Sequence, residues 1–133
     1  MQPKLGAIAV VVHEDRFLLV KRKKEPNAGT WGFAGGHVEF GETALEAAAR
    51  ELAEETGVIA RPERYITNID VIVRDAAGAI EHHFLLTAVE CHYISGTPVA
   101  ADDVSDAGWF TAAEAKQLWQ SPSVQTILDL FEV

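Results

Sequence analysis

The segment from Thr43 to Gly57 carries a complete set of helix signals and so specifies one element of the fold. Thr43, followed three residues later by Glu46, matches a capping box, in which each side chain satisfies the other residue's backbone N–H. Gly57 is typical of a helix end, because glycine adopts the left-handed conformation without steric cost. Apolar residues recur on one side at helical spacing, namely Leu45, Ala48, Ala49 and Leu52. The chain must therefore pack an amphipathic helix against another apolar surface.

That surface is predicted to be a β-sheet, because apolar, β-branched runs flank the helix on both sides. Residues 5–12 and 17–20 are separated by a short polar turn and predict a hairpin. Strand patterns resume over 65–74 and 80–94, and a short strand is expected at 109–110. The run 80–94 is apolar in both alternating sets, which predicts a central strand covered on both faces. The fold class is therefore α/β (or α+β), a mixed β-sheet with helices packed on its faces.

Two further helices are expected near the C-terminus. A second capping box begins at Thr111, and Ser121-Pro122 starts the last helix with proline at its first position. We expect Trp109 and Trp119 to lie in the core.

The length of 133 residues predicts a single domain over residues 1–133, since domains run to about 100–200 residues. Eleven Lys and Arg against twenty Asp and Glu give a formal charge of −9, which argues against duplex nucleic acid or an anionic membrane as partner. A small phosphorylated substrate remains compatible, because carboxylates can carry divalent cations that meet its phosphates. No secretory signal pattern and no membrane-length apolar run is visible, so a cytoplasmic location is expected. A homodimer remains open.

Three carboxylates share one face of the predicted helix. Glu51, Glu54 and Glu55 stand at positions i, i+3 and i+4, where like charges repel, and Arg50 alone cannot neutralise them. Hard oxygen ligands on a rigid face suit Mg²⁺ or Mn²⁺, which bridge to substrate phosphates. The alternative is an ordinary solvated acidic face. The preceding glycine-rich loop, WGFAGG, favours the metal site, because glycines let the backbone approach a ligand closely.

Read together, residues 36–58, GHVEFGETALEAAARELAEETGV, resemble the signature of the Nudix hydrolases. That signature is a glycine, five residues, Glu, seven residues, then Arg-Glu-aliphatic-x-Glu-Glu-x-Gly-aliphatic. Every specified position is filled: Gly36, Glu42, Arg50, Glu51, Leu52, Glu54, Glu55, Gly57 and Val58. The family often has a proline where this sequence has Ala34, a difference expected to affect only loop stiffness. The resemblance implies a Nudix fold, an α/β/α sandwich, over nearly the whole chain.

The resemblance also implies an activity, the hydrolysis of a nucleoside diphosphate linked to another group, with one to three divalent ions. Glu54 and Glu55 match the principal metal ligands, and Glu51 matches a further ligand or a carboxylate that orients water. The Gly36 carbonyl matches a backbone metal ligand. Glu42 and Arg50 match an ion pair that braces the loop against the helix.

Outside this motif the signals are weaker. Glu90 ends an apolar row on the strand predicted at 80–94 and is either a further metal ligand or a solvent-facing strand end. Asp102 and Asp103 are candidates for a general base, although ordinary loop solvation is the alternative. Arg22 resembles a substrate-binding arginine of the family, and Phe33 either stacks on a substrate base or packs in the core.

The region 82–109 resembles small bacterial Nudix proteins grouped with ADP-ribose pyrophosphatases, which favours an ADP-ribose-like substrate. It resembles less closely the MutT-type pyrophosphohydrolases of nucleoside triphosphates, which are the first alternative. A non-catalytic nucleotide-sensing Nudix module is the alternative from another class, and its usual mark is a broken motif. The motif in this chain is intact.

Overall fold

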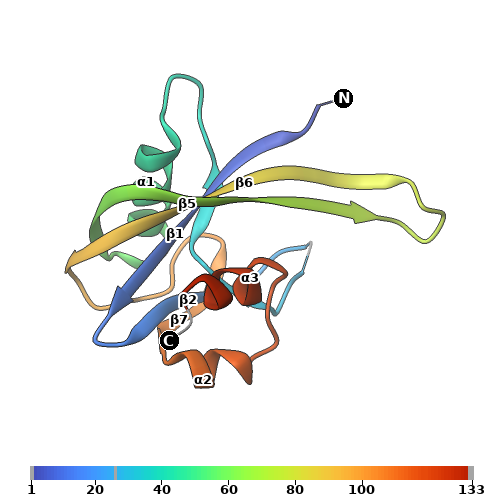
Figure 1. Cartoon of the computed structure of the whole chain (residues 1–133). Coiled ribbons are helices and arrows are strands. Elements are labelled where there is room, and N and C mark those ends of the chain that lie inside the picture. The colour runs from blue at the N-terminus through green and yellow to red at the C-terminus, as the bar shows by residue number, and fades with distance from the viewer. Residues whose placement is uncertain (1, 26, 132–133) are drawn as a thin grey trace.

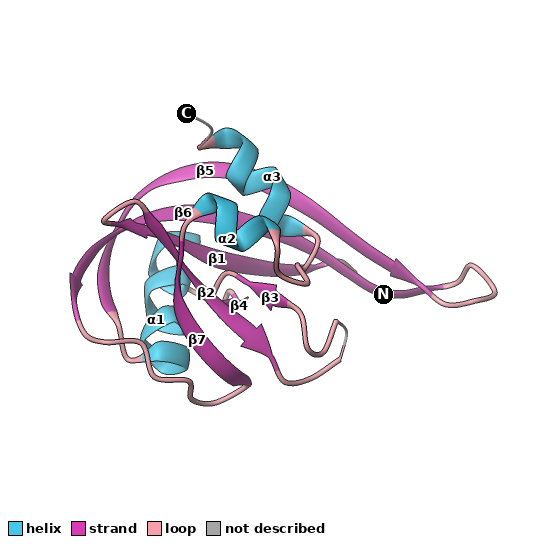
Figure 2. Cartoon of the chain, turned by 90° about the horizontal axis from the view of Figure 1, so that it is seen from below, coloured by secondary structure: helices cyan, strands magenta, loops and turns pink. Residues whose placement is uncertain are grey.

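The computed structural model describes residues 2–25 and 27–131 and contains a mixed β-sheet with helices on both faces (Figures 1 and 2). The strands are β1 (Lys4–His13), β2 (Arg16–Arg22), β3 (Trp31–Gly32), β4 (Gly35–His37), β5 (Ile59–Arg74), β6 (Ile80–Ser95) and β7 (Val104–Phe110). Their order is β3-β2-β1-β6-β5, with β4 paired to β1 and β7 paired to β2. Strands β1 and β6 run parallel and the other pairs antiparallel, so the predicted mixed sheet is confirmed.

Strands β1 and β2 form the predicted hairpin. Val12 pairs with Phe17 and His13 with Arg16, so the turn consists of Glu14 and Asp15. Both turn residues have positive φ, 52° and 62°, as in the two-residue turns whose twist matches that of paired strands.

Helix α1 (Ala44–Thr56) begins and ends where the sequence predicts. The Thr43 hydroxyl accepts from the Glu46 N–H, the Glu46 carboxylate accepts from the Thr43 N–H, and Gly57 ends the helix with φ 76°. The helix buries Ala48 and Leu52 in the core cluster on one face of the sheet. This packing fixes where the helix lies on the sheet and how it is rotated about its own axis, and so it fixes the position of the helix glutamates.

Helices α2 (Ala112–Lys116) and α3 (Ser123–Leu130) cover the opposite face (Figure 2). Val124 and Ile127 of α3 are fully buried with Val10 and Leu19 of the sheet. The result is the predicted three-layer arrangement of helix, sheet and helices.

Two strands are longer than the sequence predicts. Strand β5 begins at Ile59 rather than residue 65, because three irregularities in its register with β6 before residue 67 break the alternation of apolar and polar residues. Strand β7 begins at Val104 rather than residue 109, because it pairs only with β2 and exposes Ser105 and Asp106 to solvent.

The prediction that Trp119 lies in the core is wrong, since the residue is 69% exposed. Its ring lies against Gly29, and its carbonyl accepts a hydrogen bond from the Trp31 N–H at 2.8 Å, so it covers a loop instead. Trp109 is half-buried and packs against the core, as expected. Pro122 takes the N-cap position, so α3 starts one residue later than predicted.

Beyond the helices, β5 and β6 continue as a long two-stranded arm that projects from the body (Figure 1). On β6 only Ala88, Val89 and Cys91 are fully buried, so the predicted coverage of both faces holds for residues 88–91 alone and not for the whole strand. In the described part of the chain no helix is long and apolar enough to cross a membrane.

Candidate active site

Two consecutive glycines bring strand β4 into close contact with β1 and α1. A Cβ on Gly35 would lie 2.3 Å from the Ala7 carbonyl oxygen. A Cβ on Gly36 would lie 2.5 Å from Cδ of Glu51. A side chain at Gly35 would push the strand away, and one at Gly36 would displace either the strand or the Glu51 carboxylate, so the close approach of backbone and carboxylate depends on glycine.

Arg50 holds the carboxylates of the loop and helix together. Its Nε and Nη2 donate to the two oxygens of Glu42 at 2.7 and 3.0 Å, and its Nη1 donates to Glu51 at 2.9 Å and Glu54 at 3.0 Å. Nη2 also donates to the His37 carbonyl. The hydrogen bond from Arg50, and then that from the Glu39 backbone N–H, lower the pKa of Glu42 to about 2. The motif's one arginine therefore compensates three glutamates, whereas Glu46, an alternative partner at i−4, is occupied by the helix cap.

Glu55 is the most buried of the motif's glutamates, with 6% of its surface exposed. Its carboxylate accepts a long hydrogen bond, 3.4 Å, from the Gly35 N–H. Burial, and then the neighbouring charge of Glu51, raise the pKa of Glu55 to about 8. The protein thus places the carboxyl groups of Glu51 and Glu55 side by side in a poorly solvated position.

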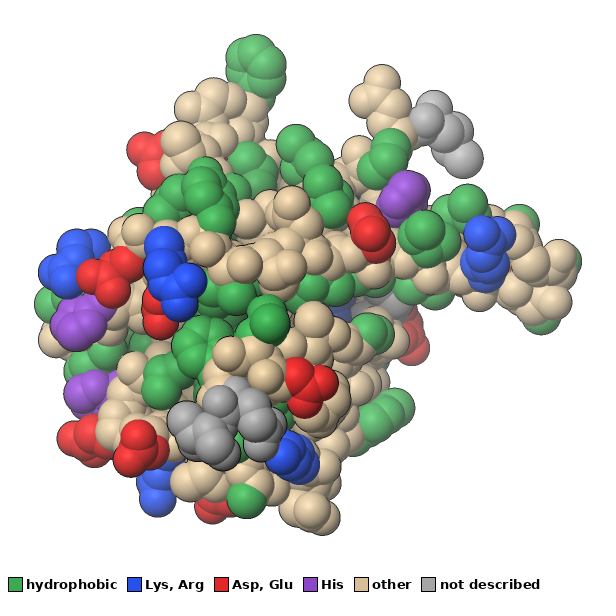
Figure 3. All heavy atoms as spheres, viewed as in Figure 1, with side chains coloured by type: hydrophobic (Ala, Val, Ile, Leu, Met, Phe, Trp, Pro, Cys, Tyr) green, Lys and Arg blue, Asp and Glu red, His purple; other side chains and the backbone are tan. Residues whose placement is uncertain are grey.

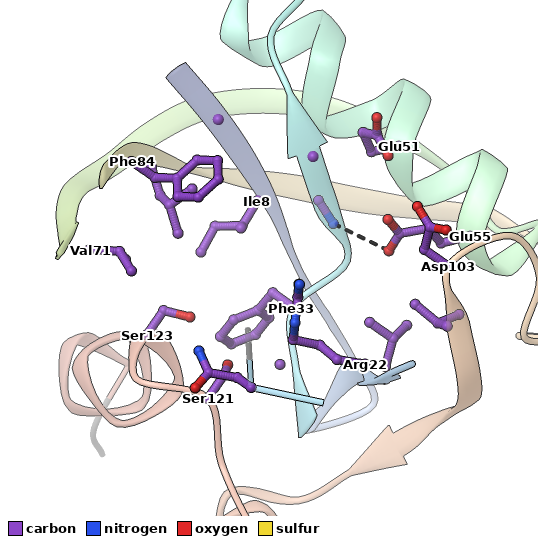
Figure 4. Close-up of a pocket in the computed structure, with 18 of the residues that line it drawn as sticks. Ile8, Arg22, Phe33, Glu51, Glu55, Val71, Phe84, Asp103, Ser121 and Ser123 are labelled. Carbon is purple, nitrogen blue, oxygen red and sulfur yellow. Dashed lines mark hydrogen bonds between the residues drawn. The ribbon is translucent and has the colours of Figure 1, made fainter. Parts of the chain in front are cut away.

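These carboxylates lie at one end of a cavity of about 330 Å³ (Figure 4). Glu51 and Glu55 stand at the acidic end with Asp103. The other end is apolar, with Ile8, Val71 and Phe84. The volume and the mixture of apolar walls with a few polar groups are typical of a small-molecule site.

Three sequence-predicted residues lie in this cavity beside the motif. Arg22 reaches it from the end of β2, and Phe33 forms part of its wall between the two ends (Figure 4). Phe33 is also buried and packs edge-on against Phe17, so it serves the core and the cavity at once. Asp103 pairs with Lys24 at 2.9 Å, and the hydrogen bond from Lys24 holds the pKa of Asp103 below its ordinary value.

Two predicted residues are not brought to the site. Glu90 pairs with Arg64 of β5 and does not line the cavity. It lies on the same face of β6 as Phe84 and Leu86, which line the cavity, but farther along the strand. Asp102 has a left-handed backbone, φ 58°, and is not among the residues that line the cavity, whereas Asp103 is.

A family comparison decides what kind of site this is. The NUDIX domain model matches residues 2–131, nearly the whole chain. The chain belongs to the Nudix family of hydrolases. Over 110 residues it is 32% identical to an ADP-ribose pyrophosphatase of Methanocaldococcus jannaschii, and the match covers 83% of this chain but only 63% of that enzyme.

Other Nudix proteins are similar over comparable lengths. The chain is 37% identical over 111 residues to the phosphatase NudJ of Escherichia coli, a match that covers 83% of this chain and 70% of that protein. The crystal structure of a MutT NUDIX hydrolase from Burkholderia pseudomallei has a TM-score of 0.85 at 31% identity, covering 97% of this chain and 98% of that one.

Nudix hydrolases generally use divalent metal ions, and the donors in this cavity fit such an ion. Glu51 and Glu55 are hard oxygen donors that lie close together, and the hydrogen bond that Glu55 accepts from Gly35 is long. The described residues contain no cluster of three or more Asp, Glu, His or Cys side chains that could hold a metal ion, and Glu54 is turned toward Arg50. A metal would therefore complete its shell with water, with the Gly36 carbonyl or with Glu54 after release from Arg50.

The sequence did not predict the apolar end of the cavity, nor the salt bridge between Lys24 and Asp103. Val71 and Phe84 are paired neighbours on β5 and β6, and the alternation of these strands would have placed them on one face. Nothing in the sequence shows that this face borders the glycine loop. Lys24 was likewise indistinguishable from the other lysines of the run 21–24 without the position of Asp103.

Proposed function

We propose that this chain is a Mg²⁺-dependent hydrolase of a phosphoanhydride bond in a nucleoside diphosphate linked to another group, with ADP-ribose as the favoured type of substrate. The observation that carries the proposal is the two-ended cavity. Carboxylates suited to a metal stand at one end, and an apolar, aromatic wall suited to a base or sugar stands at the other. A diphosphate between them would lie beside the cationic side chains of Arg22 and Lys24.

The proposed roles follow from these positions. Glu51, Glu54, Glu55 and the Gly36 carbonyl would hold the ion, which when bound neutralises phosphate charge and lowers the pKa of a bound water. Arg50 keeps the loop and the helix in fixed positions through its bonds to Glu42 and His37.

The remaining roles lie on the other side of the cavity. Arg22 and Lys24 would bind phosphate oxygens, and Phe33 would give a flat wall to the substrate. Asp103 would be the proton acceptor; it lines the cavity, and the hydrogen bond from Lys24 holds the pKa of its carboxyl group below the ordinary value.

The preference for ADP-ribose is supported by the named activity of the relative from Methanocaldococcus jannaschii. The motif itself handles only the diphosphate, so discrimination must come from the groups around the second sugar or base. Sites that hydrogen-bond a hydroxyl reject analogues without it by large factors, whereas apolar pockets discriminate weakly.

A second candidate is a MutT-type pyrophosphohydrolase of nucleoside triphosphates, supported by the name and the 31% identity of the structural neighbour from Burkholderia pseudomallei. The third, a nucleotide-sensing module without turnover, is disfavoured by the intact motif.

Steady-state kcat/KM with Mg²⁺ for ADP-ribose and for the eight common NTPs and dNTPs tests the proposal. We expect ADP-ribose to be hydrolysed faster than every triphosphate. A triphosphate that exceeds ADP-ribose by tenfold, about 1.4 kcal/mol in transition-state binding, would replace our first choice by the MutT-type activity. Absence of turnover on all of them, with binding retained, would favour the sensing module.

A further inference from the structure

The outer edge of strand β5 is open. This strand ends the sheet, and in the described ranges 2–25 and 27–131 no other strand pairs with its outer side. From Thr67 to Val73 its register with β6 is continuous, so the edge is regular there. That stretch, TNIDVIV, contains no proline, glycine or lysine. Sheets usually protect such an edge with charged side chains, lysine above all, with proline or with a bulge; here the regular stretch carries one charge, Asp70, and a register irregularity follows it between Val73 and Arg74.

The two faces of this edge differ. Asn68, Asp70, Ile72 and Arg74 are exposed, and the intervening residues Ile69, Val71 and Val73 are half-buried. Ile72 is 46% exposed between two opposite charges. Hydrophobic side chains are visible along the projecting arm in the space-filling view (Figure 3). Ile72 thus lies between an acidic and a basic side chain on an open strand edge, and this arrangement favours another β-strand as the binding partner.

The order of these three residues is self-complementary. If two copies of the edge pair antiparallel about a two-fold axis at Ile72, Asp70 of each copy lies opposite Arg74 of the other, and Ile72 lies opposite itself. Opposite charges and apolar pairs directly across two strands are both stabilising. Arg74 donates one N–H to the Gly78 carbonyl, and its other guanidinium donors remain for the carboxylate.

Neighbouring registers lack this match. An axis at Asp70 would set the two carboxylates against each other, and an axis at Val71 would set Asp70 against Ile72 and Arg74 against Asn68. The charges of Asp70 and Arg74 thus favour one register, in which Arg74 lies just past the regular stretch.

We infer that two copies of this chain associate through their β5 edges, antiparallel, with Ile72 on the two-fold axis, to form one continuous sheet. The pairing has a consequence for the cavity. Val71 lines its apolar end, and the axis places Val73 of the second copy directly opposite Val71. The second copy therefore extends the apolar wall of the cavity.

Sedimentation equilibrium of the full chain, from about 5 µM to about 1 mM, tests the association through a charge-reversal cycle. We expect the wild type to dimerise, and Asp70→Arg or Arg74→Asp alone to weaken the dimer at least tenfold, because each sets like charges opposite. The double variant Asp70→Arg/Arg74→Asp restores the opposite pairs, so its affinity should return to within about threefold of the wild type. Asp129→Arg makes the same charge change on exposed α3 and should leave association unchanged.

A monomeric wild type throughout this range overturns the inference. So does a dimer that the single reversals do not weaken relative to Asp129→Arg, or one that the double variant does not restore, because the contact then lies elsewhere.

Cross-linking tests the axis itself. Residues opposite each other in antiparallel strands have Cα atoms about 4.5–5.5 Å apart, which a disulfide can span. Ile72→Cys should therefore form a disulfide-linked dimer under mild oxidation, whereas Asn68→Cys, on the same face but four residues from the axis, should not. The native Cys91 is buried, so the wild-type chain should not cross-link and serves as the negative control. Equal cross-linking by both variants would overturn the register.

Discussion

Arg50 and Glu42 form a two-point ion pair that ties the loop before α1 to the second turn of that helix, with Nε–Oε2 at 2.7 Å and Nη2–Oε1 at 3.0 Å. The same guanidinium reaches Glu51 and Glu54. The loop, the helix and the carboxylates of the proposed metal site therefore share one cation. Loss of this cation should affect stability as well as activity.

Arg50→Ala should lower the melting temperature by at least about 5 °C, because three carboxylates lose their partner and repel one another. Thermal unfolding followed by circular dichroism in EDTA measures this shift. Arg61→Ala is the matched control, since Arg61 is exposed and pairs with Glu63 alone. Equal effects of the two substitutions would show that Arg50 does not brace the site.

In metal-free protein, stability should fall as the pH rises from about 5 to about 8. The pKa of Glu55 is raised from 4.5 to about 8 in the folded state, so between these values the folded chain holds a proton that the unfolded chain has released. The free energy of unfolding then decreases by at most about 1.4 kcal/mol per pH unit, the value for one proton. Urea unfolding at several pH values in EDTA measures this slope, and Glu55→Gln should flatten it.

Millimolar Mn²⁺ or Mg²⁺ should raise the melting temperature at neutral pH, because an ion that binds only the folded chain stabilises it by mass action. Glu55→Gln should lose most of this gain, whereas Glu63→Gln, an exposed glutamate outside the cavity, should keep it. A melting curve indifferent to both ions in the wild type would contradict a metal site at these carboxylates.

Glu54→Gln should reduce kcat at saturating Mg²⁺ at least 10²-fold, about 2.7 kcal/mol in the barrier, while the protein stays folded. Glu54 is partly exposed, and its only hydrogen-bond partner among the described residues is Arg50, so the substitution removes a ligand without opening the core. Wild-type kcat in this variant would exclude Glu54 from the metal site.

The sequence predicted best where local signals are complete. Helix α1 was predicted to the residue, because the Thr43 capping box and Gly57 specify its two ends and need no tertiary information. The grouping of Glu51 and Glu55 followed from helical spacing alone. The direction of Glu54 toward Arg50 did not, because side-chain orientation depends on the charges around it.

The sequence did not predict which residues far apart in the chain come into contact. For Glu90 the sequence left two interpretations open, a metal ligand or a solvent-facing strand end, and the structure pairs it with Arg64 of β5. Trp119 was predicted to lie in the core, yet it covers Gly29 at the surface. Both positions depend on contacts between residues far apart in the chain.

Gly36→Ala should remove most of the activity while the chain still folds. The position has no left-handed backbone, so alanine is permitted locally, but its Cβ would lie 2.5 Å from Cδ of Glu51. Either the carboxylate or the strand must move, and a displacement of about 1 Å at a reacting group can cost 10²-fold in rate. We therefore expect kcat/KM to fall about 10²-fold and the melting-temperature gain from Mn²⁺ to shrink with it. Gly108→Ala is the control, because its Cβ would meet only the Phe110 ring at 3.5 Å, an ordinary contact. If Gly36→Ala retained both the activity and the gain from Mn²⁺, close contact between this backbone and Glu51 would not be part of the site.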